Sequence, residues 1–138
     1  MPNWKVYCFL HGERRKNIIV EWLKNEAVPP DQIAVFQEKI DALERSGPDM
    51  VPGFIWGPVA KDIYKMKIKG NKGWKQLRPM CCRGPFELNA YTVLVGAIEK
   101  DGRLDPRDAV ARAQSNLQKL KNDPTRRICE RLTTKPEK

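Results

Sequence analysis

The side chains best suited to chemistry lie in one basic stretch, residues 61–83, where eight Lys and Arg stand against a single acid, Asp62. This stretch therefore holds +7 of the chain's net charge of +9. Ammonium and guanidinium groups neutralise phosphates and stabilise negative charge that develops during phosphoryl transfer. The charge is a local feature, and it indicates an acidic partner: nucleic acid, an anionic surface or an acidic protein.

Alternation within residues 63–69 predicts a strand, because side chains along a strand point to opposite faces with period two. Tyr64, Met66 and Ile68 would face a core, and Lys65, Lys67 and Lys69 would face water. Lysines about 6–7 Å apart, two strand rises, resemble the spacing of phosphates along a nucleic-acid strand. The alternative interpretation is a solvated strand face that is basic for solubility or edge protection. Neighbouring residues support an RNA-binding face, since aromatic planes among cations suit base stacking: Lys75, Arg78, Arg83, Trp74 and Tyr64.

The remaining reactive side chains give weaker signals. His11 is the only histidine, so it could serve as a general base or be an ordinary surface residue of a turn. The four cysteines contain no CxxC pair, and we expect reduced, mostly buried thiols, with Cys81 and Cys82 on opposite strand faces. No metal site and no cofactor are expected.

Length and composition set the frame for these residues. At 138 residues the chain is long enough for one domain with a real core, which we assign to residues 1–123, followed by a basic polar tail over 124–138. No run reaches the ~18–20 apolar residues needed to span a bilayer, and the N-terminus lacks an apolar signal region. We therefore expect a cytoplasmic protein without a membrane partner.

The N-terminal half is expected to begin with a strand over residues 4–10. Asn17 can cap a helix that Pro29-Pro30 ends, and a second helix starts near Asp31 and stops at Gly47-Pro48. The apolar residues of the second helix recur at helical spacing and predict a narrow apolar seam: Ile33, Phe36, Ile40 and Leu43. We expect these two helices to form a hairpin. Residues 48–58 are predicted to be a connector without regular strands, in which Trp56 is a packing side chain.

The C-terminal half is expected to continue from the 63–69 strand through a turn at 70–73 to a hairpin partner over 74–82. Residues 91–98 are nearly all apolar, which predicts a central strand buried on both faces. Asp105 followed by Pro106 predicts a helix start. The resulting order favours an α+β fold: an antiparallel sheet of about four strands, with the helices against one face and the lysine row on the open face.

This order, with these residues, resembles the RelE/ParE toxin superfamily, in particular its HigB-like, phage-derived branch. The similarity covers roughly residues 4–120. Four sequence segments carry the similarity: IVEWL at 19–23 in the first predicted helix, IYKMK at 63–67 in a predicted strand, KQLR at 75–78 and LVGAIEK at 94–100. The last segment is followed by a predicted helix that starts with a proline. The resemblance implies a RelE-like fold.

The resemblance also implies a function: the toxin of a type II toxin-antitoxin system. Such a protein is an mRNA interferase, an endoribonuclease that cuts mRNA on the ribosome, and a cognate antitoxin, of helix-turn-helix type, silences it. Cleavage uses the 2′-hydroxyl as internal nucleophile and needs no metal. The protein must help to deprotonate that hydroxyl, stabilise the phosphorane and protonate the leaving oxygen.

The residues that match the family's motifs are Lys67 on its strand, Lys100 at the end of the last motif, and Lys75 or Arg78 at an arginine position. We favour Arg78, because its planar guanidinium suits bidentate phosphate contact. The chain departs from the family at Lys65, where a glutamate is common, and at Glu99, which replaces a lysine. Glu99 could have taken over acid–base work or could pair with Lys100.

Two other functions remain open on the same fold. The first is a catalytically inactive module that binds RNA or an antitoxin through the basic face. The second is a ParE-like inhibitor of DNA gyrase, which would not require Lys67, Arg78 and Lys100 to converge.

Overall fold

Strand β7 (Ala90–Val95) is the centre of the fold, and all six of its residues are buried. The computed structural model, which describes residues 3–69 and 73–132, places β7 between β1 (Lys5–His11) and β6 (Met80–Arg83). β1 runs parallel to β7, whereas β6 runs antiparallel to it. Residues 90–95 therefore form the buried central strand that the sequence predicts, but the strand ends before Gly96, and Ile98 lies in a separate strand, β8 (Ile98–Lys100).

The main sheet is mixed and has seven strands. Its order is β10–β1–β7–β6–β4–β3, with β2 paired to β1. The other strands of this sheet are β10 (Arg127–Ile128), β4 (Ile63–Met66), β3 (Ile55–Ala60) and β2 (Lys16–Asn17). A smaller sheet has the order β5–β8–β9, formed by β5 (Gln76–Leu77), β8 (Ile98–Lys100) and β9 (Arg103–Asp105). The architecture is α+β, but the expectation of one antiparallel sheet of about four strands is wrong, because β1 joins β7 in parallel.

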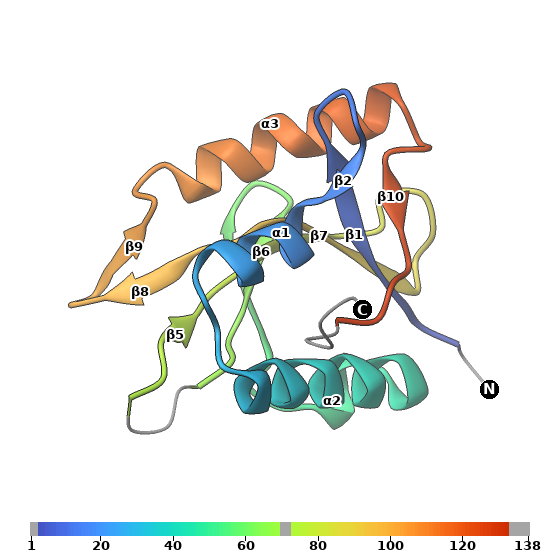
Figure 1. Ribbon diagram of the computed structural model, residues 1–138. Helices are drawn as coiled ribbons and strands as arrows, with labels where there is room; N and C mark the ends of the chain where they lie inside the picture. Colours follow the sequence, from blue (N-terminus) through green and yellow to red (C-terminus); the bar gives the residue numbers. More distant parts are fainter. Residues whose placement is uncertain (1–2, 70–72, 133–138) are drawn as a thin grey trace, which may run out of the picture.

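Helices cover both faces of the main sheet (Figure 1). The helices are α1 (Ile18–Asn25), α2 (Pro30–Ser46) and α3 (Ala109–Asn122), with a short 3₁₀ turn at Pro48–Met50. α2 lies below the sheet and α3 above it in Figure 1. The expected open sheet face is therefore wrong, because a strand that is apolar on both sides needs a cover on both sides. No helix in the described ranges is long and apolar enough to cross a membrane.

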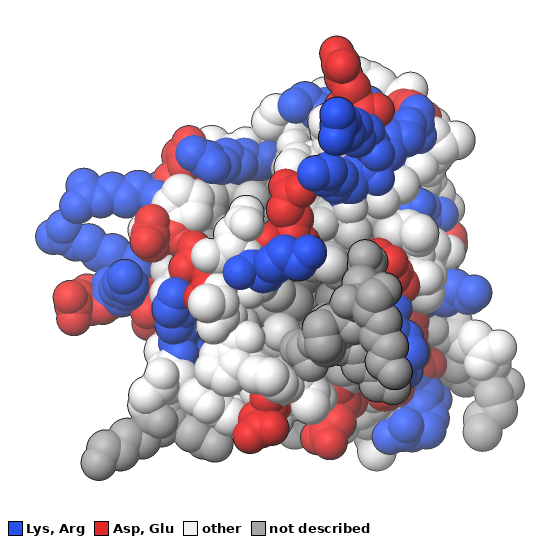
Figure 2. Space-filling model, viewed as in Figure 1, with Lys and Arg blue, Asp and Glu red and all other residues white. Residues whose placement is uncertain are grey.

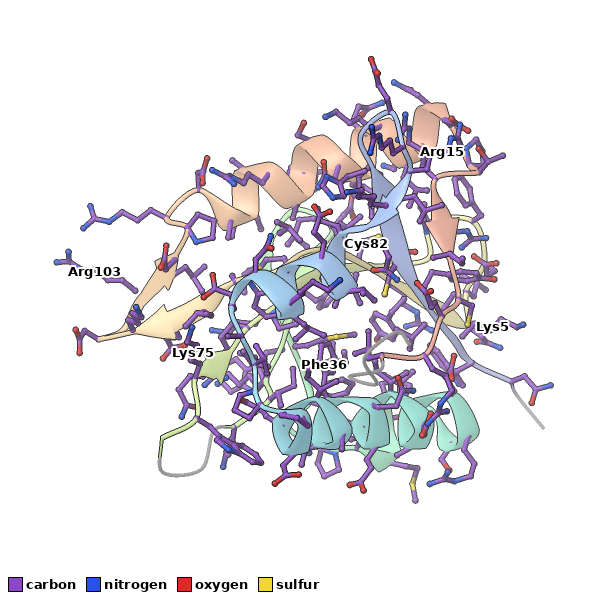
Figure 3. All side chains as sticks on the ribbon, in the orientation of Figure 1. Lys5, Arg15, Phe36, Lys75, Cys82 and Arg103 are labelled. Carbon is purple, nitrogen blue, oxygen red and sulfur yellow. The ribbon has the colours of Figure 1, made fainter. Side chains whose placement is uncertain are left out.

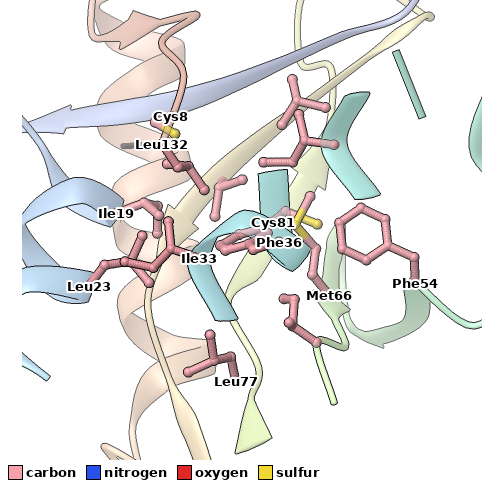
Figure 4. Packing of buried hydrophobic residues seen from close by; sticks show 14 of the residues in the cluster. Cys8, Ile19, Leu23, Ile33, Phe36, Phe54, Met66, Leu77, Cys81 and Leu132 are labelled. Carbon is pink, nitrogen blue, oxygen red and sulfur yellow. The ribbon is translucent and has the colours of Figure 1, made fainter. Parts of the chain in front are cut away.

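Two hydrophobic clusters fill the space on either side of the sheet. The first lies toward α2 and joins both N-terminal helices to β1, β4 and β7 (Figure 4). Its largest fully buried side chains are Phe36, Phe54, Ile19, Leu43, Met66, Ile68 and Leu77. The second lies under α3 and contains Phe9, Ile63, Met80, Cys82, Leu94, Leu117 and Leu120. Cys81 belongs to the first cluster and Cys82 to the second, as strand alternation predicts.

Local sequence explains most helix boundaries. The Asn17 side chain accepts hydrogen bonds from the backbone amides of Ile19 and Val20, at 3.0 and 3.1 Å, and so caps α1. The predicted seam of α2 is buried throughout: Ile33, Phe36, Ile40 and Leu43. α3 begins at Ala109 and not near Asp105. The expected start is wrong because Asp105 pairs with Ile98 in the β8–β9 hairpin.

Two segments differ from the sequence prediction, and a third lies mainly outside the described residues. The connector over 48–58 contains the first part of β3, so the prediction of no regular strand there is wrong. The tail contributes β10, which pairs with β1, and Leu132 is buried, so residues 127–132 are packed against the domain. The expected turn at 70–73 falls mainly on residues 70–72, which lie outside the described residues.

The Trp22 side chain packs α1 against the end of β7. Its indole lies directly over Gly96, where an added Cβ would stand 2.0 Å from the ring. Non-bonded carbon atoms prefer about 3.5–4.0 Å. Only glycine therefore allows this contact.

We predict that Gly96→Ala destabilises the protein by about 1–3 kcal/mol, because the methyl group overlaps the indole. Urea unfolding of the variant measures the loss. Trp22→Leu in the same chain should recover part of it, giving a non-additive double-mutant cycle. Additive effects of the two substitutions would contradict the proposed contact.

Candidate functional site

An exposed tryptophan with two lysines forms the centre of the candidate site. Trp56 on β3 is 51% exposed, and it is register-paired with Lys65 on β4. The ammonium nitrogen of Lys67 lies 3.7 Å from the centre of the indole ring, and that of Lys65 lies 5.7 Å from it. We call Trp56, Lys65 and Lys67 the Trp56 patch. Its cations lie over an aromatic plane, which is the combination that single-stranded nucleic-acid sites use.

Strand register brings Arg78 next to this patch. The pairing of β4 with β6 continues as a bridge between Ile68 and Leu77, so Lys67 lies opposite Arg78 on the same side of the ladder. The Arg78 backbone amide donates to the carbonyl of Ala97 at 2.8 Å and so links the two sheets. Two of the residues that the sequence singles out, Lys67 and Arg78, are thus brought together.

Arg78 is buried and bound within the protein. Its side chain is 8% exposed, and its Nε donates to Glu99 Oε1 at 3.2 Å. Nη1 donates to the carbonyl of Leu77 at 2.8 Å, and Nη2 donates to Gln76 Oε1 at 3.4 Å. Glu99 is 35% exposed on its side chain, so it keeps access to solvent. Arg78 is therefore placed to hold and orient a carboxylate.

The side of the sheet that carries the patch is the side covered by α3. Ile63, two residues before Lys65, is fully buried in the cluster under α3, as is Met80, which pairs with Lys65. Lys65 and Lys67 are half-buried, and Lys69 is exposed. The row of lysines therefore lies on the strand face that α3 covers, and not on an open sheet face.

Lys75, the alternative to Arg78, is held by the N-terminal helices. Its ammonium group contacts Glu26 Oε1 at 3.0 Å and the Glu26 carbonyl at 2.9 Å, at the carboxyl end of α1. Its own carbonyl accepts a hydrogen bond of 2.6 Å from the Gln32 amide of α2. The Lys75 side chain is 40% exposed, so it is more accessible than Arg78.

Lys100 does not join the pair of Lys67 and Arg78. It follows Glu99 in β8, so its side chain points to the opposite face from the carboxylate that binds Arg78. It is exposed and pairs in register with Arg103 across the β8–β9 hairpin. Figure 2 shows basic side chains gathered around this hairpin, and Figure 3 shows Arg103 projecting away from the body of the protein.

Arg83 and Trp74 also lie outside the patch. Arg83 ends β6, with its guanidinium 5.0 Å above the Trp4 ring and its Nε 2.9 Å from the carbonyl of Leu88. Trp74 is half-buried before β5. In contrast, Trp56 belongs to the patch, and the prediction that it is a packing side chain is wrong because the side chain is exposed. The available signal was Pro58, since proline in a strand is confined to edges and bulges, where side chains stay exposed.

Three of the four thiols are buried in the core, and Cys129 is exposed. Cys8, Cys81 and Cys82 are buried free cysteines, and burial raises the pKa of Cys8 and of Cys82 to about 12. These thiols stay protonated at neutral pH and are poor nucleophiles. In the described ranges, no three His, Cys, Asp or Glu side chains are grouped so that they could hold a metal ion.

Comparison with known proteins adds no assignment. No protein-family model, curated protein or solved structure matches this chain.

We predict that Arg78→Ala destabilises the fold by about 1–3 kcal/mol, because it truncates a buried side chain and removes its hydrogen bonds to Glu99, Leu77 and Gln76. Lys67→Ala should cost less than about 1 kcal/mol, since it removes only an exposed cation–π contact. Chemical denaturation of both variants measures the difference. An Arg78→Ala variant as stable as the parent would contradict the role assigned to this side chain.

Proposed function

We propose that this chain is the toxin of a type II toxin-antitoxin system, a RelE-like mRNA interferase that cleaves ribosome-bound mRNA through the Trp56 patch and Glu99. The observation that carries the proposal is an exposed indole in contact with two ammonium groups, with Lys67 opposite the Arg78 that binds the Glu99 carboxylate. The resemblance to the RelE/ParE superfamily, HigB-like branch, supports the same reaction class. The element order, with α1 and α2 after the first two strands and α3 between β9 and β10, keeps an N-terminal helix pair and a C-terminal helix.

In this proposal, Trp56 stacks on a base, and Lys65 and Lys67 bind the adjoining phosphates. Glu99 removes the proton of the 2′-hydroxyl, whose oxygen attacks the neighbouring phosphorus. The bond to the 5′-oxygen breaks, and that oxygen takes a proton from an ammonium group of the patch. The products are a 2′,3′-cyclic phosphate and a free 5′-hydroxyl. The lysines stabilise the phosphorane because positive groups placed at developing charge lower the barrier.

The remaining residues have supporting roles in the proposal. Arg78 is a positioning residue, because its guanidinium is occupied by Glu99 and by backbone and side-chain oxygens. Lys75, Lys69 and Lys100 would contact phosphates outside the reaction centre. A cognate antitoxin, of helix-turn-helix type, would silence the toxin.

A second candidate function is RNA or antitoxin binding without cleavage. One observation favours it: the Glu99 carboxylate is already bound by the buried guanidinium of Arg78, at 3.2 Å. The two candidates differ in whether Glu99 performs chemistry.

We predict that Trp56→Ala weakens binding to a short single-stranded RNA by about 1–3 kcal/mol, equivalent to roughly 5- to 150-fold. Lys67→Ala should weaken binding regardless of sequence and lower the salt-dependence slope by about 1, because one phosphate contact is lost. Fluorescence anisotropy at several salt concentrations measures both. Lys24→Ala, at an exposed lysine of α1, is the matched control. Equal losses in the Lys24 and Lys67 variants would rule out a localised site.

Growth after induction in bacteria tests the catalytic part. The parent chain is expected to arrest growth, and Glu99→Gln is expected to relieve the arrest while RNA binding stays within a few-fold of the parent. A folding check by denaturation accompanies it, because Glu99 also pairs with Arg78. Full arrest by Glu99→Gln would refute its role as base. Absence of arrest by the parent, with RNA binding intact, would favour the binding module.

A further inference from the structure

A groove of about 580 Å³ lies between α1 and α3, away from the Trp56 patch. It forms where the carboxyl ends of the parallel strands β1 and β7 meet, at His11 and at Val95-Gly96. Its volume is in the range of small-molecule sites, and the carboxyl edge of parallel strands is where ligands commonly bind in sheets with helices on both faces. The groove is independent of the residues used in the proposed function.

The Trp22 indole lines the middle of the groove and is fixed there by its contact with Gly96. Asn116 of α3 lines the opposite wall, and its side-chain amide donates to the carbonyl of Leu94 at 2.8 Å. A fixed aromatic ring facing a polar wall is suited to a flat heterocycle, since stacking on aromatic side chains holds bases without regard to sequence.

One end of the groove carries Lys119 and His11, with the Glu21 carboxylate next to the histidine. Lys119 lies on α3 seven residues after Arg112, so the α3 wall spans about 10 Å along the helix axis. Lys119 and His11 both line this groove and an adjoining hollow, which places them at the same end. His11 Nε2 is 2.9 Å from Glu21 Oε1, and its ring is held in place by that carboxylate. An ammonium group beside an oriented imidazole is suited to a phosphate.

The other end carries Asp105, which precedes α3 and is exposed. The two remaining acids of the groove are already paired. Glu21 contacts His11 and, at 3.6 Å, Lys16, and Glu26 contacts Lys75 at 3.0 Å. Asp105 is therefore the carboxylate best placed to accept hydrogen bonds from a ligand, as carboxylates accept from the exocyclic amine of a base.

We propose that this groove binds a nucleotide unit with an amino-bearing base: the phosphate at Lys119 and His11, the base on Trp22, and its exocyclic amine at Asp105. The chemistry is the same for a free nucleoside monophosphate and for one unit of an RNA strand. Arg112 also lines the groove, but it forms an ion pair of 2.9 Å with Asp108, so we assign it no role in binding the nucleotide.

The single histidine makes the test direct, because its imidazole gives one proton signal set in the NMR spectrum of the full chain. AMP at constant ionic strength is expected to shift this signal in a saturable manner, with adenosine and IMP binding at least five-fold more weakly. Lys119→Ala should weaken AMP binding by at least five-fold. Asp105→Asn should bring the affinities for AMP and IMP close together.

Lys121→Ala is the matched control, since it removes an exposed lysine from another side of α3 and should leave AMP binding unchanged. The trinucleotide ApApA separates the two sources: tighter binding than AMP assigns the groove to an RNA strand, and weaker binding assigns it to a free nucleotide. The proposal is overturned if millimolar AMP leaves the signal unmoved, if inorganic phosphate shifts it equally, or if Lys121→Ala is as damaging as Lys119→Ala. None of these outcomes depends on whether the protein cleaves RNA.

Discussion

The burial of β7 on both faces is the constraint on which the rest of the structure depends. A strand of six buried residues satisfies its backbone groups only between two other strands, here β1 and β6, and its side chains need a cover above and below. α2 and α3 supply that cover. The parallel pairing of β1 with β7 then brings two carboxyl ends together, and Trp22 packs on Gly96 at that edge.

The same constraint arranges the charges. Since helices occupy both faces, the basic side chains of residues 61–83 cannot spread over an open sheet. Among the described residues, they separate into groups that include the Trp56 patch beside β3 and β4, Lys75 at the end of α1 and Arg83 against Trp4. Arg78, which lies opposite Lys67 in the strand register, binds the partly exposed carboxylate of Glu99 on the next strand. The basic segment therefore contributes to a candidate site that contains both cations and a carboxylate. Such a site can combine electrostatic stabilisation with acid–base chemistry.

Local signals in the sequence predict the elements that depend on local physics. The Asn17 cap, the buried seam of α2 and the apolar β7 run all depend on residues close in the chain, and all are confirmed. Long-range pairing is different. No residue near β1 indicates that it runs parallel to β7. β3, which contains Gly57 and Pro58, and the two-residue β10 form strands only beside their neighbours. Asp105 failed as a helix start because pairing with Ile98 prevailed over a local cap signal.

The same distinction between local signals and long-range pairing applies to the candidate site. Lys65 and Lys67 were predictable from alternation on one strand, whereas their contact with Trp56 depends on the register between β3 and β4. The separation of Lys100 from Arg78 likewise follows from β8 alternation once Glu99 is known to face inward. Residue type indicated which side chains could act, and tertiary pairing decided which of them meet.

The most direct measurement is the mapping of mRNA 5′ ends after a short induction of the protein in bacteria, beside matched inductions of Lys67→Ala and Lys24→Ala. The account predicts new ends inside translated codons for the parent chain and for Lys24→Ala, and a loss of most of them for Lys67→Ala. A parent chain that produces no new ends, or new ends that are equally abundant in the Lys67 variant, would contradict the assignment of an mRNA-cleaving site to the Trp56 patch.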